Sequence, residues 1–275
     1  MKLFISSDIE GTCGINHWDE TEIGKPGYDR FAREMTREVR AACDGALSSG
    51  CFQNAETDEI RIKDAHDSAR NIIPEELPES EMIRLIRGWV TIPGNMMAGV
   101  KGCDAAAMTG YHSGAYSAGN NLSHTSNLHN QVIEVNGSRT SEFDLNAMFA
   151  AYYGVPTIFL AGDKALCEEA KELIPALTAV PVNEGWGNAT VSLQPAIAQQ
   201  RIREKMREAV EQFRRDPKRC LMTLPEQFHV EIDFKDLEKA ERGSWYPGAK
   251  RVDDKRISYD SSDYFEVTRF LYFTL

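Results

Sequence analysis

Apolar residues follow two different rhythms along the first two thirds of the chain. Short apolar runs of the kind that form buried strands fall at residues 2–7, 59–63, 104–109 and 157–161. Between these runs, apolar positions recur every three or four residues over 28–47, 142–152 and 164–173, which is the period of a helix. Strands that alternate with helices predict an α/β fold with a mostly parallel sheet and flanking helices.

The remainder of the chain has a different pattern. Pro195 opens a long helix whose apolar stripe comprises Ile197, Ile202, Met206, Val210 and Phe213. Strands at 228–233 and 256–259 follow, and a last helix is expected near 262–273. We therefore predict an α/β domain over residues 1–185 and a smaller α+β domain over 186–275. Within the first, Asn136-Gly137 predicts a hairpin between strands 131–135 and 139–141.

Composition narrows the class of protein. The 275 residues carry a net charge of -11, and no Lys/Arg-rich run dominates, which argues against a nucleic-acid binder. No apolar stretch approaches the roughly 18 residues of a membrane span, and the N-terminus lacks the apolar core of a signal peptide. The six cysteines form no CxxC pair, so reduced thiols are expected. Together these features predict a cytoplasmic protein that does not act on a membrane.

Three of the predicted strands end in metal-binding residue types. Asp8 and Glu10 follow the first strand at i and i+2, and so share one face. His66 lies just beyond strand 59–63, and His112 lies just beyond strand 104–109. Ligands of open α/β sheets bind at the carboxyl edge, where these side chains would meet. Carboxylate and imidazole together suit zinc, manganese or iron better than calcium, so a metal site is predicted there.

Further residues extend this predicted site. Glu142 begins a helix, where it serves either as a fifth ligand or as an acid that interacts with the helix dipole. Five ligands are a natural number for two ions that share a carboxylate. His124 lies in a polar segment and is either a general acid, base or nucleophile, or a structural loop residue. Asp64 and Asp67 are expected to orient His66 through its second ring nitrogen.

The same residues form a series of motifs that resembles the zinc-dependent D-aminopeptidase family of metallopeptidases. The matching segments are Ser7-Asp8-Ile9-Glu10-Gly11, Asp64-Ala65-His66, Gly110-Tyr111-His112, Ser123-His124, Ala161-Gly162-Asp163 and the block from Glu142 to Pro156.

The resemblance implies a site with two zinc ions. Its ligands would be Asp8, Glu10, His66, His112 and Glu142, with Asp8 shared between the ions. His124 would be the nucleophile or general base. The resemblance also implies cleavage of an N-terminal D-residue from short peptides, and assembly into a homo-oligomeric ring of ten subunits.

Two stretches depart from the family pattern. Residues 12–27 and 71–100 contain no matching motif, and loops of this kind should shape the substrate pocket. The chirality of the substrate therefore stays open at this point.

Two other functions also stay open: a metal-dependent hydrolase of another amide or of a phosphoester, and a non-catalytic protein that binds metal or peptide. A phosphoesterase would need Lys or Arg near the site, where Lys63 is the nearest. A binding protein would leave His124 without a task. An aromatic C-terminal tail needs cover from a second subunit or from its own core (Tyr264, Phe265, Phe270, Tyr272 and Phe273).

Overall fold

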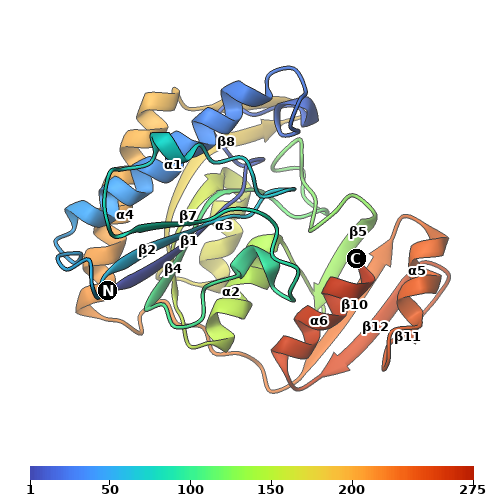
Figure 1. The fold of residues 1–275 in the computed structure, drawn as a ribbon. Helices are drawn as coiled ribbons and strands as arrows, with labels where there is room; N and C mark the ends of the chain where they lie inside the picture. The colour runs from blue at the N-terminus through green and yellow to red at the C-terminus, as the bar shows by residue number, and fades with distance from the viewer.

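The larger of two sheets has seven strands and is almost entirely parallel. The computed structural model describes residues 1–275, and Figure 1 shows the chain from the N-terminus in blue to the C-terminus in red. Neighbouring strands follow the order β3 (Ile83–Ile86), β2 (Glu59–Asp64), β1 (Lys2–Ser7), β4 (Ala105–Tyr111), β7 (Thr157–Asp163), β8 (Thr178–Trp186) and β9 (Ala189–Ser192). Only β9 runs antiparallel to its neighbour.

Helices cover this sheet on two sides (Figure 1). The helices α1 (Tyr28–Ser48) and α4 (Pro195–Arg215) pack against each other and contact the central strands. The helices α2 (Glu142–Tyr152) and α3 (Lys164–Leu173) also contact each other and the strands β4, β7 and β8. The apolar stripe of α1 is buried as its spacing predicted, because that face meets the sheet and α4 (Phe31, Met35, Val39, Ala42 and Ala46).

The smaller sheet is antiparallel and draws on two distant parts of the chain. Its order is β11 (Lys250–Arg251), β12 (Arg256–Ser261), β10 (Phe228–Phe234), β5 (Asn130–Val135) and β6 (Ser138–Arg139). Asn136 and Gly137 join β5 to β6 with positive φ angles of 53° and 77°, which confirms the predicted hairpin. The helices α5 (Leu237–Ser244) and α6 (Tyr264–Thr274) contact β10 and β12.

The α/β fold with a mostly parallel sheet is confirmed, while the two sheets suggest a different division of the chain. A boundary at residue 185 would lie inside β8, and α4 packs against the larger sheet. The hairpin β5–β6 pairs with β10 of the smaller sheet. We therefore propose units that follow the sheets: residues 1–129 with 140–220, and residues 130–139 with 221–275.

The aromatic C-terminal tail packs mainly on its own subunit. Tyr264 and Phe270 are buried, and the Tyr264 hydroxyl donates a hydrogen bond to the carbonyl of Leu145 in α2 at 2.8 Å. Phe273 is the exception, with 64% of its surface exposed. Of the two alternatives for this tail, cover by its own core therefore holds for most of it, because α6 joins the smaller sheet to α2.

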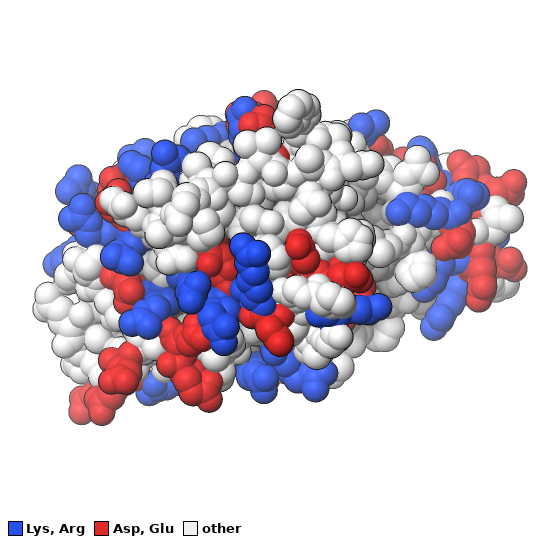
Figure 2. All heavy atoms as spheres, turned by 90° about the horizontal axis from the view of Figure 1, so that it is seen from above, with Lys and Arg blue, Asp and Glu red and all other residues white.

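Two features of the surface bear on the expected partners. On the face drawn in Figure 2, Lys and Arg side chains are interspersed with Asp and Glu. None of the helices combines the length and the apolar character needed to cross a bilayer.

The order of the strands creates a crevice between β1 and β4. From β1 the chain passes outward to β2 and β3, and then returns to β4 on the other side of β1. Connections therefore diverge at the carboxyl ends of β1 and β4, where open α/β sheets bind ligands. Glycines allow the two strand ends to touch: a Cβ on Gly11 would lie 1.8 Å from the Tyr111 carbonyl oxygen, and one on Gly110 (φ +69°) would lie 2.1 Å from that of Asp8.

A buried carboxyl group of α1 supports the segment that follows β1. Glu38 is 1% exposed, and its Oε1 accepts a hydrogen bond from the backbone nitrogen of Cys13 at 2.9 Å. The other oxygen, Oε2, has no hydrogen-bond partner. Burial, reinforced by the nearby Glu34, raises the pKa of Glu38 from 4.5 to about 8.

The substitution Glu38→Gln should remove a pH dependence of stability. Between the unfolded pKa of 4.5 and the folded pKa of about 8, the native state holds a proton that the unfolded state releases. The free energy of unfolding of the wild type should therefore fall as pH rises through this range. Glutamine keeps the acceptor for the Cys13 backbone nitrogen and does not titrate. The free energy of unfolding of Glu38→Gln should therefore exceed that of the wild type by an amount that grows with pH to a few kcal/mol, since one pKa unit corresponds to about 1.4 kcal/mol. Urea unfolding at pH 5, 6.5 and 8 measures this. The exposed control Glu204→Gln should keep the wild-type slope; the same slope in Glu38→Gln would contradict the prediction.

Candidate metal centre

The structure brings the five predicted ligands together at the crevice between β1 and β4. Asp8 and Glu10 follow β1 directly, His66 follows β2, and His112 follows β4. Glu142 is the first residue of α2. Four of them are at most 3% exposed, and the side chain of His66 is 11% exposed. The carboxyl edge of the sheet thus gathers acids and imidazoles that are far apart in the sequence.

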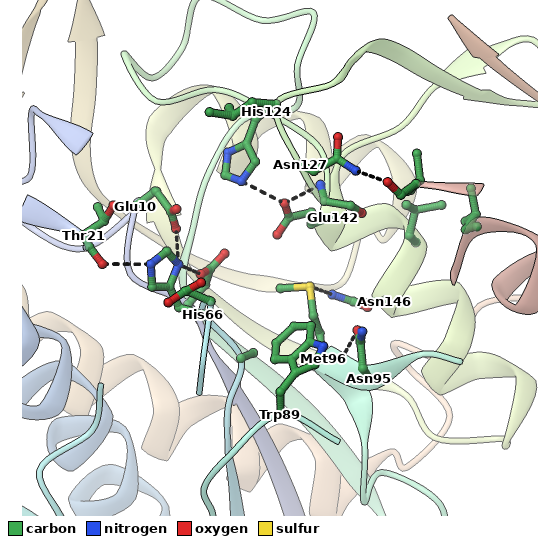
Figure 3. Close-up of a pocket in the computed structure, with 18 of the residues that line it drawn as sticks. Glu10, Thr21, His66, Trp89, Asn95, Met96, His124, Asn127, Glu142 and Asn146 are labelled. Atoms are coloured by element: carbon green, nitrogen blue, oxygen red, sulfur yellow. Dashed lines mark hydrogen bonds and ion pairs between the residues drawn. The ribbon is translucent and has the colours of Figure 1, made fainter. Parts of the chain in front are cut away.

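Asp8 lies between two groups of side chains. The Nδ1 atom of His66 is 3.2 Å from Oδ1 of Asp8 and 3.2 Å from Oε2 of Glu10. The Nε2 atom of His112 is 3.5 Å from the other Asp8 oxygen, Oδ2, and 3.6 Å from Oε1 of Glu142. Each oxygen of Asp8 therefore faces a different group, as a carboxylate shared between two cations would. Figure 3 shows Glu10 and His66 of the first group and Glu142 of the second.

The donor atoms fit a metal because two of them are buried and make no hydrogen bond. Oε2 of Glu10 and Nε2 of His112 are buried without a hydrogen bond. Buried polar atoms are nearly always paired, so such orphans need an explanation. A cation bound at each of the two groups would give each of these atoms a partner.

The charges at the site attract a cation. Burial opposes the ionised form of Asp8, but contacts with His112 and His66 outweigh it and hold the pKa of Asp8 well below its usual range. Burial likewise opposes protonation of the two imidazoles. Glu10 and Asp8 nevertheless raise the pKa of His66 well above its usual range, and Glu142 and Asp8 do so for His112. The carboxylates therefore draw positive charge into the site, and a bound metal would displace these imidazole protons.

Backbone carbonyls fix which imidazole nitrogen faces the site. Nε2 of His66 lies 2.9 Å from the carbonyl of Thr21, and Nδ1 of His112 lies 3.0 Å from the carbonyl of Ser113. A carbonyl can only accept a hydrogen bond, so these nitrogens carry the proton. The opposite nitrogens are left free to bind a cation.

The prediction that Asp64 and Asp67 orient His66 is wrong. Asp64 is fully buried and accepts hydrogen bonds from the backbone nitrogens of Asn71 and Ile72 at 2.6 and 2.8 Å. Asp67 is exposed at the mouth of the pocket. The carbonyl of Thr21 takes the orienting role instead, and no side-chain pattern could have revealed it.

His124 lies beside the second group of ligands. Its Nδ1 is 2.9 Å from the carbonyl of Leu122, and its Nε2 is 3.5 Å from Oε1 of Glu142. The ring stacks on His112 with centroids 4.3 Å apart, and meets Trp18 edge to face at 5.3 Å. His112, His124 and Glu142 together could hold an ion, so the geometry permits a ligand role as well as proton transfer.

Asp163 supports His112 indirectly, through Ser113, and this role was not predicted from the sequence. This last residue of β7 accepts hydrogen bonds from the backbone nitrogen of Ser113 at 2.6 Å and from its hydroxyl at 2.7 Å. The same carboxylate caps α3 through the backbone nitrogen of Leu166 at 2.8 Å. It therefore fixes the residue whose carbonyl orients His112.

A cavity of about 960 Å³ opens over the predicted ligands. Its walls include residues from the two stretches that carry no family motif, as expected for pocket-shaping loops (Trp18, Ile23, Trp89 and Met96). Leu271, Tyr272 and Leu275 also line the cavity, and the Asn127 side chain donates to the backbone oxygen of Leu275 at 3.1 Å (Figure 3). The larger sheet and the helix α6, which packs on the smaller sheet, therefore contribute to one pocket.

A cysteine near Glu10 in the sequence and three further histidines lie outside this pocket. Cys13 is buried, and burial raises the pKa of its thiol to about 12, so the thiol is neutral. His17, His129 and His229 do not line the cavity. His17 instead caps the short helix η1 (Trp18–Glu20).

Comparisons with known proteins identify the family of the chain. The family model described as D-aminopeptidase matches residues 1–273. The chain is 31% identical to the D-aminopeptidase of Bacillus subtilis (strain 168) over 270 residues, which is 97% of this chain and 93% of the relative. It is also similar to the solved structure of the Zn-dependent D-aminopeptidase DppA from Bacillus subtilis, described as a self-compartmentalizing protease. The TM-score is 0.89 at 28% identity, covering 100% of this chain and 96% of that one.

The substitution Asp163→Ala should weaken both the fold and the metal centre. It leaves the Ser113 donors and the start of α3 unsatisfied, so we expect a loss of about 2–4 kcal/mol in the free energy of unfolding. Because His112 loses its support, metal affinity should fall about 10–100-fold. Denaturant unfolding and metal titration measure the two effects. Ser113→Ala, which removes only the hydroxyl contact, should show a smaller loss of stability; unchanged metal affinity in Asp163→Ala would exclude the supporting role.

Proposed function

The chain belongs to the D-aminopeptidase family, and from this premise we propose that it removes an N-terminal D-residue from short peptides with two zinc ions. Family membership makes it a zinc-dependent aminopeptidase. The observation that carries the proposal of two ions is the position of Asp8 between two groups of donor atoms.

We assign the ligands from their donor atoms. Asp8, Glu10 and His66 would hold one ion, and Asp8, His112 and Glu142 would hold the other. Carboxylate oxygens with free imidazole nitrogens are the donor set that zinc takes in hydrolytic sites. Bound zinc supplies Lewis acidity to the scissile carbonyl and to a water molecule.

His124 is proposed to move a proton at its Nε2 atom. Its Nδ1 faces the carbonyl of Leu122 and therefore carries the proton. Nε2 is left with a lone pair, and the residue lines the cavity. In this state the ring can accept a proton from a nucleophile and return it to the leaving amine. Stacking on His112 and contact with Trp18 hold the ring in that orientation.

The alternative functions have less support. Arg70 is the only Lys or Arg that lines the cavity, whereas a phosphoesterase needs several basic side chains to bind the phosphate group. A protein that only binds peptides would have no use for a histidine held with a free basic nitrogen beside the donor atoms.

A closed homo-oligomer, specifically a ring of ten subunits, is part of the proposal. The related structure is described as a self-compartmentalizing protease, which requires several subunits. Trp186 and Trp245 are 76% and 80% exposed here, and large exposed aromatic side chains are typical of interfaces. Analytical ultracentrifugation of the purified protein would count the subunits; a 30.8 kDa particle would exclude the ring.

Metal removal should abolish activity and destabilise the fold. Metal analysis should find close to two transition-metal ions per chain. Chelation should lower the melting temperature, because the carboxylates that share the site then repel each other without a counter-charge. Asp8→Ala should lose both ions, since it belongs to both groups, while Glu10→Ala should lose mainly one. Full activity after chelation, or a higher melting temperature for the metal-free protein, would refute the two-metal site.

His124→Ala should keep both ions and lose most turnover. Proton transfer by a positioned side chain contributes about 10²–10⁴-fold to the rate, and kcat should fall by that factor. KM should change much less, because the pocket and the ligands remain. The measurements are metal content, melting temperature and steady-state kinetics on one preparation.

Two control variants separate the possible roles of His124. His112→Ala removes a proposed ligand, so its metal content and activity should fall together. His129→Ala removes an exposed histidine outside the cavity and should resemble the wild type. Loss of an ion from His124→Ala would make this residue a ligand, and near-normal turnover would remove it from the chemistry.

A further inference from the structure

The cavity is lined by a single basic side chain. Arg70 is the only Lys or Arg among the 26 residues that line it, whereas Glu22 and Asp67 add negative charge beyond the three proposed carboxylate ligands. The Nε atom of Arg70 donates to the hydroxyl of Ser68 at 3.2 Å. No Asp or Glu oxygen lies within the 4.0 Å of an ion pair, and the terminal guanidinium nitrogens have no hydrogen-bond partner. Arg70 is an exposed residue of the cavity lining, and its guanidinium, whose planar fork suits a carboxylate, is therefore unpaired.

The loop that carries Arg70 is held in a strained conformation. Asp67 and Ala69 have positive φ angles of 45° and 55°, although neither is glycine. Such residues persist only where surrounding contacts impose them, and they cluster at ligand sites. Here the contacts come from Asp64, which accepts hydrogen bonds from the backbone and side-chain nitrogens of Asn71 at 2.6 and 2.9 Å. The backbone nitrogen of Gly88 adds a bond of 2.6 Å to the carbonyl of Ala69.

The same loop carries a proposed metal ligand. The side-chain nitrogen of Asn71 donates to the carbonyl of His66 at 2.8 Å, which ties the two ends of the loop together. Arg70 is four steps along the chain from His66, so their Cα atoms lie at most about 14 Å apart at about 3.5 Å per residue. A dipeptide spans about 7 Å and a tripeptide about 10 Å on the same scale. Arginine at the end of this loop is thus within reach of the far end of a short peptide.

We propose that Arg70 binds the C-terminal carboxylate of a di- or tripeptide whose free amino end lies at the metal ligands. This inference rests on the proposed function and adds the residue that selects short substrates with a free carboxylate. The acidic cavity would otherwise repel that carboxylate, because Glu22 and Asp67 lie on the same rim. A longer peptide would carry its carboxylate past the guanidinium and lose the contact.

The experiment compares a dipeptide of D-residues with its C-terminal amide. The enzyme is zinc-loaded wild type, Arg70→Gln, Arg70→Lys and the control Arg84→Gln, which removes an exposed arginine of β3 outside the cavity. Hydrogen bonds to charged groups are strong enough to predict that the wild type prefers the acid about 10–100-fold in kcat/KM. Arg70→Gln should lose this preference through a higher KM for the acid, and should cleave the amide like the wild type. Arg70→Lys should keep part of the preference, and Arg84→Gln all of it.

The outcomes distinguish this inference from the proposed function. Equal cleavage of acid and amide by the wild type would overturn the role of Arg70 while leaving an aminopeptidase. Equal losses on both substrates in Arg70→Gln, at normal metal content and melting temperature, would also overturn it. Cleavage of neither substrate by the wild type would instead count against the proposed function. Lengthening the peptide with a free carboxylate should reduce the preference step by step, and a preference independent of length would contradict the proposed reach.

Discussion

The crowding of buried carboxylates at the end of β1 is the constraint on which the rest of the site depends. Asp8 and Glu10 are almost fully buried, Glu142 lies across the same crevice, and like charges at close range are costly without a counter-charge. The side chains around these carboxylates reflect this electrostatic cost. The free nitrogens of His66 and His112 point at the carboxylates, and two of the donor atoms make no hydrogen bond within the chain. Stability alone does not explain this arrangement, because removing charged groups from water costs more free energy than their mutual attraction usually returns.

The topology explains how so many charges can be held at all. Diverging connections at the switch between β1 and β4 open a crevice, and Gly11 and Gly110 let the two strand ends approach within contact distance. Support then comes from backbone carbonyls and from Asp163, not from further cations. The smaller sheet adds a second wall through α6, whose hydrogen bond from Tyr264 to Leu145 fastens it to the helix that begins with Glu142. Chemistry therefore resides on the larger sheet, and the shape of the pocket depends on both.

The sequence predicted those parts that follow from local periodicity. Strands β1 and β2 and helices α1 to α4 were expected close to their observed bounds, because period and capping are properties of neighbouring residues. The convergence of the five predicted ligands could be expected because parallel strands end at one edge. Three kinds of feature could not be predicted. The pairing of the β5–β6 hairpin with β10 joins segments about a hundred residues apart, Thr21 acts through its backbone, and Asp64 supports a loop, contrary to its predicted role.

Asp64 has a structural role that differs from the one predicted for it. A carboxylate next to a metal-binding histidine is expected to bind that histidine, yet here a carbonyl already does so. Asp64 is therefore free to hold the strained segment from His66 to Asn71 in one shape. That shape sets the distance between a ligand at one end of the loop and a cation at the other. One buried carboxylate thus links the candidate metal centre to the rim of the pocket, so the loop that would help to hold the metal would also limit the length of the peptide.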